Sequence, residues 1–271
     1  CLHTAKRLSV VKKSNAKDLG LIYSRLACNC AGVFTANKVK AESLQVCMRQ
    51  LKETNEGRAI IVNSGNANCF IGDRGVRDAF AVIAKTAHGL GVLKKSVFIA
   101  STGIIGRPLP LAKIKKALPK LCAQVKAKKC SLDDFAESIL TTDTHKKIIS
   151  VQVRLKGTTV FITGIAKGAG MIYPHLKKDS PHATMLAFIL TDANIKKQLL
   201  ASALAKAAEN SFNRISIDGC MSTNDTLLVM ANGAASHTPI TEKDKDFKVF
   251  YHGVQYVCEA LARKIEEDAE G

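Results

Sequence analysis

The run SPHATMLAFILTD, residues 180–192, places a threonine directly before the most apolar stretch of the chain. A threonine hydroxyl is a poor nucleophile unless a base adjoins it, and one solution is a threonine whose own α-amino group is that base. Thr184 is internal, so its hydroxyl would first have to attack the carbonyl of Ala183 and convert the peptide bond into an ester that water cleaves. The freed α-amine would titrate near pH ~8, which suits a base at neutral pH. The alternative is an ordinary β-branched residue that opens a strand, and this stretch alone favours that alternative.

Two further polar segments follow buried strands, where backbone N–H groups commonly point at a ligand. RAIIVNSGNAN predicts a strand over 59–62 and a loop over 63–68, and SVFIASTGIIGRPLP predicts a strand over 96–100 and a loop over 101–110. A hydroxyl and a glycine N–H at a strand end can approach a developing oxyanion closely. On its own, the STG of the second loop favours a plain turn.

The elements that position these segments alternate between helical and strand-like patterns, which is typical of an α/β or α+β fold. Ser131 is predicted to cap a helix, and Lys156-Gly157 is predicted to turn a hairpin. Ile195, Leu199 and Ala203 are expected on one helix face. The remaining predictions are helices that cover 76–87, 110–121, 131–141, 193–210 and 250–265, and a hairpin over 151–166.

Several motifs occur together along nearly the whole chain. They are AGVFTANKVKAES, NSGNAN, ASTGIIGRPLP, TTDT, ITGIAKGAGMIYP, ATMLAFILTDA and SFNRISIDGCMSTNDTLLVMANG. Together they resemble the ornithine acetyltransferase family, the bifunctional glutamate N-acetyltransferases and amino-acid N-acetyltransferases of arginine biosynthesis. The resemblance implies an α/β fold with layered α-β-β-α arrangement, of the self-cleaving threonine-nucleophile kind.

The resemblance also implies how the chain is divided and how it reacts. Cleavage is expected between Ala183 and Thr184, giving an alpha-chain-like segment, 1–183, and a partial beta-chain-like segment, 184–271. The two chains are expected to stay associated, within a higher homo-assembly. Thr184 would accept the acetyl group of N-acetylornithine and pass it to glutamate in a ping-pong cycle, with Thr102 and Gly103 as the oxyanion hole.

Substrate-binding residues follow from the same resemblance. Thr141 and Thr142 of TTDT, together with Thr184, are expected to contact the substrate. Lys167 of KGAGM would pair with a substrate carboxylate, and Glu270 would supply the counter-charge for the ammonium group of ornithine. We therefore expect no cofactor and no metal, with acetyl-CoA as an alternative acetyl donor if the chain resembles the bifunctional members of the family.

The chain departs from the family pattern in two places. The segment between Pro174 and Thr184 is longer than in the family, roughly by an insertion within HLKKDSPH. Lengthening a loop costs only ~0.6 kcal/mol per doubling, but a loosened Ala183–Thr184 linkage predicts slow or absent self-cleavage as a competing outcome. The family also continues past Gly271, so the chain is expected to be C-terminally truncated. The alternative function is therefore a truncated or degenerate relative that folds or associates without transferring acetyl groups.

Composition narrows the classes of protein. The chain has 271 residues, of which 46% are hydrophobic, so it can bury a large core. No apolar run approaches the ~20 residues that are needed to cross a bilayer. We therefore expect a soluble protein without membrane partners. The net charge of +17 comes from scattered lysine pairs, and only 5% of residues are aromatic. This pattern argues against nucleic acid as a partner and favours small anionic substrates or a solvated surface.

The nine cysteines are odd in number, widely spread and without a C-x-x-C pair. That usage favours a reducing compartment, so we expect a cytoplasmic protein, or an organellar one if a transit peptide precedes Cys1. Cys28 and Cys30 could form half of a metal site, but without a second cluster a structural role is favoured.

Overall fold

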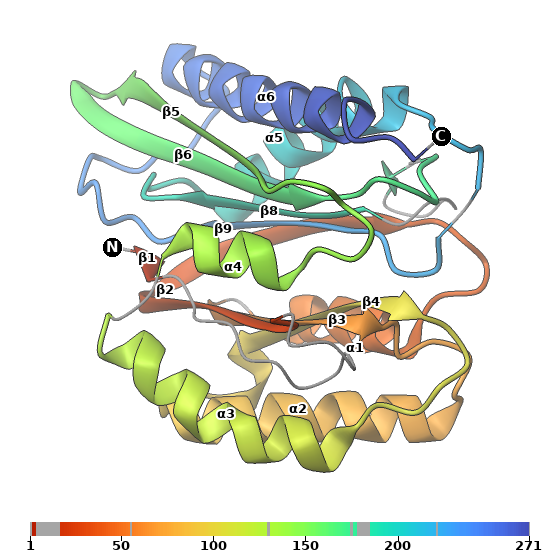
Figure 1. The fold of residues 1–271 in the computed structure, drawn as a ribbon. Helices are drawn as coiled ribbons and strands as arrows, with labels where there is room; N and C mark the ends of the chain where they lie inside the picture. The colour runs from red at the N-terminus through yellow and green to blue at the C-terminus, as the bar shows by residue number, and fades with distance from the viewer. Residues whose placement is uncertain are drawn as a thin grey trace.

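The long strand β2 (Leu19–Thr35) is the centre of the fold. The computed structural model describes residues 2–3, 17–54, 56–128, 131–173, 176–177, 185–220 and 222–270. Within these residues, the main strands follow the order β4-β3-β2-β9-β8-β6-β5. β2 pairs with β3 up to Cys28 and with β9 from Asn29 onward, with a shift in register between Tyr23 and Cys28. Because such an irregularity bends a strand, β2 contributes to two stacked layers of sheet (Figure 1).

Each layer consists of strands that lie next to one another in space but not always in the chain. One layer holds β2, β3 (Gly57–Asn66) and β4 (Val97–Ile104). The other holds β5 (Lys147–Leu155), β6 (Thr158–Lys167), β8 (Leu186–Thr191) and β9 (Thr226–Ala231). Two short strands, β1 (Leu2–His3) and β7 (Leu176–Lys177), pair with β2.

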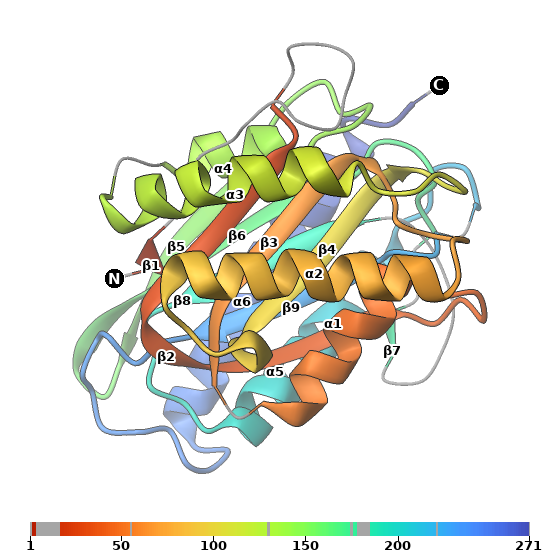
Figure 2. The same ribbon diagram turned by 90° about the horizontal axis from the view of Figure 1, so that it is seen from below.

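Helices cover the outer face of each layer, so the α-β-β-α arrangement expected from the sequence is confirmed (Figures 1 and 2). α2 (Asp73–Leu90) and α3 (Leu111–Lys126) lie over the β2-β3-β4 layer. α5 (Lys197–Glu209) and α6 (Lys245–Glu266) lie over the other layer. The remaining helices are α1 (Glu42–Glu53), which packs on β4 and α2, α4 (Leu132–Ser138), and the short η1 (Lys94–Ser96) and η2 (Phe212–Arg214).

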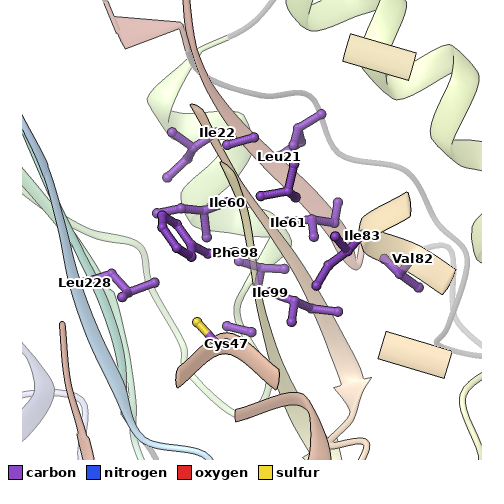
Figure 3. Packing of buried hydrophobic residues seen from close by; sticks show 14 of the residues in the cluster. Leu21, Ile22, Cys47, Ile60, Ile61, Val82, Ile83, Phe98, Ile99 and Leu228 are labelled. Atoms are coloured by element: carbon purple, nitrogen blue, oxygen red, sulfur yellow. The ribbon is translucent and has the colours of Figure 1, made fainter. Parts of the chain in front are cut away.

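Side chains alternate along β2, β3 and β4, so both faces of these three strands are packed against other elements. Ile22, Ile60 and Phe98 lie side by side across the strands and point toward Leu228 of β9, between the two layers (Figure 3). The neighbouring row faces α2 instead, and consists of Leu21, Ile61 and Ile99 against Val82 and Ile83. Every one of these side chains is buried. Strands with both faces buried hold the layers together through hydrophobic burial.

The helices and the hairpin were largely predicted from local signals. The Ser131 hydroxyl accepts a hydrogen bond from the N–H of Asp134 at 3.0 Å, which is the expected N-cap. Lys156 and Gly157 both have positive φ, 50° and 80°, as the tight turn between β5 and β6 requires. α2, α5 and α6 also occupy the segments predicted for them.

Other predictions need correction. β3 and β4 continue to Asn66 and Ile104, so the polar residues assigned to loops end the strands instead. α3 continues past the predicted end at residue 121 to Lys126, and this part of the helix buries Leu121 and Val125. Ile195 lies before α5, not on its face, in a bridge to Ile240.

The cysteines behave as small hydrophobic residues. Seven free thiols are described, and all except Cys220 are buried. Burial raises the pKa of Cys28 to about 11 and that of Cys47 to about 12, so these thiols stay neutral. In the part of the chain that the structure describes, no group of three or more His, Cys, Asp or Glu side chains is arranged to hold a metal ion. A helix long and apolar enough to cross a membrane is likewise absent from the described residues.

Candidate active site

A pocket of about 740 Å³ opens where β3, β4 and β6 end. β3 and β4 are parallel, so their carboxyl ends meet at one edge of the sheet, where ligands commonly bind. Five residues singled out in the sequence line this pocket, namely Thr102, Gly103, Thr141, Thr142 and Lys167. The fold therefore brings together segments that are up to 65 positions apart in the chain. Arg107 and Met171 also line the pocket and were not predicted.

Gly103 is a position that only glycine fits. Its φ is +127°, and a Cβ there would lie 2.5 Å from the backbone nitrogen of Asn66 and 2.6 Å from Gly65 Cα. The backbones of β3 and β4 therefore approach each other closely at the pocket, which a side chain would prevent. Thr102, beside it, is almost fully buried, whereas Gly103 is open to the pocket.

Neutral side chains hold this pair of strand ends. Ser101 Oγ donates to Asn63 Oδ1 at 2.7 Å, and Asn63 Nδ2 donates to the carbonyl of Asn66 at 2.8 Å. Asn66 Nδ2 in turn donates to the carbonyls of Arg107 and Pro108 at 3.0 and 3.1 Å. Buried amides whose hydrogen bonds are satisfied by backbone groups fix the backbone. The asparagines of NSGNAN thus act as supports for the strand ends.

Lys167, the last residue of β6, reaches the pocket from the other layer. The residue is only 3% exposed, and its ammonium donates to Thr141 Oγ1 at 3.0 Å. Burial lowers the pKa of Lys167, and the carboxylates of Asp143 and Asp225 oppose that effect. A buried cation beside a pocket is suited to hold an anionic group of a ligand.

An ion-pair cluster supports Lys167 and Thr141. Lys147 is fully buried and pairs with Asp143 at 2.9 Å and with Asp268. Asp143 also accepts from the N–H groups of Gly168 at 2.6 Å and Thr141 at 3.1 Å. Burial raises the pKa of Asp143, but Lys167, Lys147 and the Gly168 N–H outweigh it, so the net shift is downward. This cluster joins the TTDT segment, the end of β6 and the end of α6.

Asp268 shows the same balance of causes. Burial raises its pKa, while hydrogen bonds from Lys147 and from Thr144 lower it, to about 2 overall. Two residues further on, the N–H of Glu270 donates to the carbonyl of Ala169 at 2.9 Å. A side chain at Gly170, which lines the pocket, would overlap the Glu270 carboxylate. Glu270 therefore lies at the side of the pocket, next to its lining.

Ala183 and Thr184 lie outside the described residues, as does most of the longer stretch before them. The next residue, Met185, is fully buried, and its N–H donates to the Asp225 carboxylate. The carbonyl of Met185 accepts from Thr226 N at 3.0 Å. Leu186, the first residue of β8, pairs directly opposite Lys167. The strand that follows Thr184 thus begins beside the buried lysine of the pocket.

Comparison with solved structures defines the class of fold first. The chain aligns over 99% of its length with 84% of an L-aminopeptidase D-Ala-esterase/amidase from Ochrobactrum anthropi, a variant of the Ntn hydrolase fold. The TM-score is 0.52 and the sequence identity is 10%, so this similarity shows the fold alone.

Residues 4–271 match the ArgJ family, and the chain belongs to that family. It is 42% identical over 259 residues to the arginine biosynthesis bifunctional protein ArgJ of Caldanaerobacter subterraneus subsp. tengcongensis, covering 96% of this chain and 62% of that protein. The Thermotoga neapolitana protein of the same name is also 42% identical, with 96% and 63% coverage. The chain thus spans about three fifths of the length of these relatives.

Two solved ArgJ-type structures align with a shorter part of the chain. The ArgJ protein of Bacillus halodurans gives a TM-score of 0.58 at 35% identity, over 64% of this chain and 90% of that one. The ornithine acetyltransferase of Mycobacterium tuberculosis, solved in complex with ornithine, gives 0.56 at 30% identity, over 64% and 92%. The family expected from the sequence motifs is therefore confirmed.

Proposed function

We propose that this chain belongs to an acetyltransferase of arginine biosynthesis that moves the acetyl group of N-acetylornithine to glutamate. The observation that supports this most directly is the pocket, which gathers Thr102, Gly103 and Lys167 beside the start of β8. β8 follows Thr184, so a nucleophile at that position would be attached to a rigid, buried strand. Family membership supports the same activity.

In the proposed reaction, the Thr184 hydroxyl attacks the acetyl carbonyl carbon of N-acetylornithine while the α-amine of Thr184 takes the hydroxyl proton. The oxyanion that forms is stabilised by Thr102 and Gly103 at the end of β4. The carbon–nitrogen bond then breaks, the amine returns the proton to the departing ornithine nitrogen, and acetyl remains on Thr184 as an ester. Glutamate enters, and its amine attacks the ester carbonyl and loses a proton to the α-amine of Thr184. The ester carbon–oxygen bond then breaks, the α-amine returns the proton to the threonine oxygen, and N-acetylglutamate leaves.

The α-amine becomes available only if the peptide bond between Ala183 and Thr184 is cut, so we include self-cleavage into 1–183 and 184–271 in the proposal. The alignments support a divided chain. The solved Bacillus halodurans chain is shorter than this one, because the match covers 64% of this chain and 90% of that one. The full-length relatives are longer, because nearly the whole of this chain covers 62% of them. We further propose that the two chains remain together in a homo-assembly.

The pocket also fits the proposed substrates. Lys167 is placed to hold a carboxylate, and Thr141, which accepts its hydrogen bond, offers a hydroxyl next to that charge. Glu270, at the side of the pocket, is suited to the ammonium group of ornithine. The Mycobacterium tuberculosis relative was solved with ornithine, which supports the same ligand class here.

The proposed cycle uses only groups of the protein and its substrates, with no cofactor, and acetyl-CoA would enter only as a second acetyl donor. A reducing compartment such as the cytoplasm agrees with the seven described free cysteines. Each donor would acetylate the same threonine. One assay of that threonine can therefore compare the two donors when they are supplied separately.

The test is to incubate the purified chain with N-acetylornithine, or separately with acetyl-CoA, and to analyse its peptides by mass spectrometry. We expect one acetyl group on a peptide that begins at Thr184, lost again when glutamate is added. Thr184→Ala should carry no acetyl group and should run as one band on a denaturing gel, whereas the natural chain runs as two. A folded, cleaved sample that gains no acetyl group from either donor would contradict the proposal.

A further inference from the structure

Two adjacent buried residues directly before β9, Asn224 and Asp225, form hydrogen bonds with Ser101 and Met185 respectively. We propose that they form one positioning element that holds the end of β4 and the start of β8 in register. Asn224 would fix the oxyanion loop and Asp225 the peptide that follows the nucleophile. This inference rests on the proposed function for its catalytic meaning.

Asn224 ties together the ends of β3 and β4. Its side-chain amide donates to the carbonyl of Ser101 and to the carbonyl of Ala67, both at 2.7 Å. Its own oxygen accepts from Thr223 Oγ1 at 2.7 Å, so both amide hydrogens and the oxygen are used. Ser101 directly precedes Thr102. A buried amide therefore sets the position of the peptide that leads into the proposed oxyanion hole.

Asp225 performs the corresponding task on the other layer. It is fully buried, and its carboxyl group accepts the N–H of Met185. The N–H of the next residue, Thr226, donates to the carbonyl of Met185 at 3.0 Å. Met185 is thus held on both its N–H and its carbonyl by two consecutive residues. Any displacement of Asp225 would move the chain immediately after Thr184.

The surroundings of Asp225 favour the neutral form of its carboxyl group. Burial raises its pKa well above the ordinary value, and the Met185 N–H and the Lys167 ammonium only partly oppose this. Its second oxygen has no hydrogen-bond partner among the described residues. A charged oxygen in such a place would be costly. Asparagine, which offers a neutral oxygen of the same shape, should therefore be able to replace Asp225.

The two contacts are coupled because the residues are neighbours. Consecutive residues of an extended chain direct their side chains to opposite sides, and their Cα atoms are ~3.8 Å apart. Asn224 contacts the β3-β4 layer, and Asp225 contacts Met185, directly before β8. One rigid backbone link therefore spans the two halves of the proposed site. Misplacing reacting groups by about 1 Å costs on the order of 10²-fold in rate.

The experiment compares Asn224→Ala and Asp225→Ala with a matched control, Gln50→Ala, in the full chain. Gln50 is as buried as Asn224, and its amide also donates to two backbone carbonyls, Lys94 at 2.6 Å and Val97 at 3.1 Å. Those carbonyls lie at the opposite end of β4. We expect both test variants to acetylate Thr184 about 10²-fold more slowly at saturating N-acetylornithine. Gln50→Ala should keep the rate within a few-fold of the natural chain.

Hydrogen exchange provides a readout that needs no activity. In Asn224→Ala the backbone amides of 101–104 should exchange about 10-fold faster or more than in the natural chain. In Asp225→Ala the amide of Met185 should exchange faster by a similar factor. Gln50→Ala should speed exchange only in the residues around Val97. Asp225→Asn should restore both the exchange at Met185 and the rate. If a variant fails to fold, exchange in the natural chain still tests the positioning role. That role requires the amides of 101–104 and of Met185 to exchange slowly, and fast exchange there would overturn it.

The outcomes separate this inference from the proposed function. Unchanged exchange in the test variants, a rate loss no greater than in Gln50→Ala, or an Asp225→Asn variant as slow as Asp225→Ala would overturn the positioning role. If the exchange results hold but the natural chain never carries acetyl on Thr184, the proposed activity fails while the structural coupling stands.

Discussion

The two sides of the pocket hold their backbone segments in place with different kinds of contact. The amide side, formed by Asn63, Asn66, Ser101, Gly103 and Asn224, fixes the ends of β3 and β4 with neutral hydrogen bonds. The charged side, formed by Asp143, Lys147, Lys167 and Asp268, fixes the end of β6 and the TTDT segment with buried ions. Both sides hold backbone segments in place. They should fail in different ways when a single group is removed.

The difference follows from the energetics of each kind of contact. A neutral hydrogen bond contributes about 1 kcal/mol net, and its loss leaves one polar group unpaired. A buried ion pair is roughly balanced as a whole, but the loss of one partner leaves a charge in a poorly solvated place. The charged side should therefore be the more fragile side and the only one that depends on pH.

Removing Lys147 should have the largest effect. Lys147→Met would leave the buried carboxylates of Asp143 and Asp268 without their shared cation. We expect the free energy of unfolding to fall by about 3–5 kcal/mol, measured by urea denaturation at neutral pH.

The control is the neighbouring Lys146→Met. Lys146 pairs with Asp133 at 2.6 Å, but both side chains are largely exposed, at 40% and 66%. Its loss should cost at most about 1 kcal/mol. Equal losses in the two variants would show that the buried cluster contributes no more than a surface pair.

Thr102→Val tests the amide side through rate instead of stability. Valine has the shape of threonine without the hydroxyl, so the fold should be retained while one proposed oxyanion donor is lost. We expect acetylation of Thr184 to slow by about 10²–10³-fold, measured in a single turnover with N-acetylornithine.

Thr163→Val serves as the matched change, because the Thr163 hydroxyl contacts Ser150 at 2.7 Å on the exposed hairpin. It should leave the rate unchanged. A Thr102→Val enzyme that is destabilised but reacts at the normal rate would remove Thr102 from the oxyanion hole and leave it a structural residue.

The charged side should also respond to acid. The pKa of Asp268 is about 2, against an ordinary 3.8, so the folded state binds its proton less readily than the unfolded state. The ionised Asp268 therefore contributes ~2 kcal/mol to the free energy of unfolding above about pH 4. This contribution is lost as the pH falls through the pKa of Asp268 in the folded state. Urea denaturation at a series of pH values measures it. Asp268→Asn should flatten this part of the profile, and a profile as steep as that of the natural chain would assign the acid sensitivity to other carboxyl groups.

Much of the fold was predictable because its signals are local. Helical periodicity located α2 and α6, and Ser131 and Lys156-Gly157 marked a cap and a turn. β2 was not predicted, because its two halves pair with different partners and both of its faces are buried for much of its length. Such a strand lacks the alternating pattern that identifies a half-exposed one. α1 and β9 were missed as well.

The site was predictable to the extent that motifs carry it. Thr102, Gly103 and Lys167 were chosen from their motifs and lie in one pocket. The link between Lys147 and Asp268 could not be read from the sequence, because they are 121 positions apart and only the packing of α6 on β5 brings them together. The TTDT motif drew attention to Thr141 and Thr142, whereas its aspartate, Asp143, links Thr141, Gly168 and Lys147.

Ser101→Ala should give the smallest effect and the clearest contrast with the charged side. The change removes one neutral hydrogen bond, from Ser101 Oγ to Asn63 Oδ1 at 2.7 Å, and leaves the second bond of Asn63 in place. We expect a loss of about 1 kcal/mol in the free energy of unfolding. Because neither partner titrates, the loss should be the same near pH ~7 and at the acid end of the range, whereas the contribution of Asp268 disappears there. A loss that varies with pH would mean that the two sides of the pocket are coupled across it, and that the amide side takes part of its stability from the buried ions opposite.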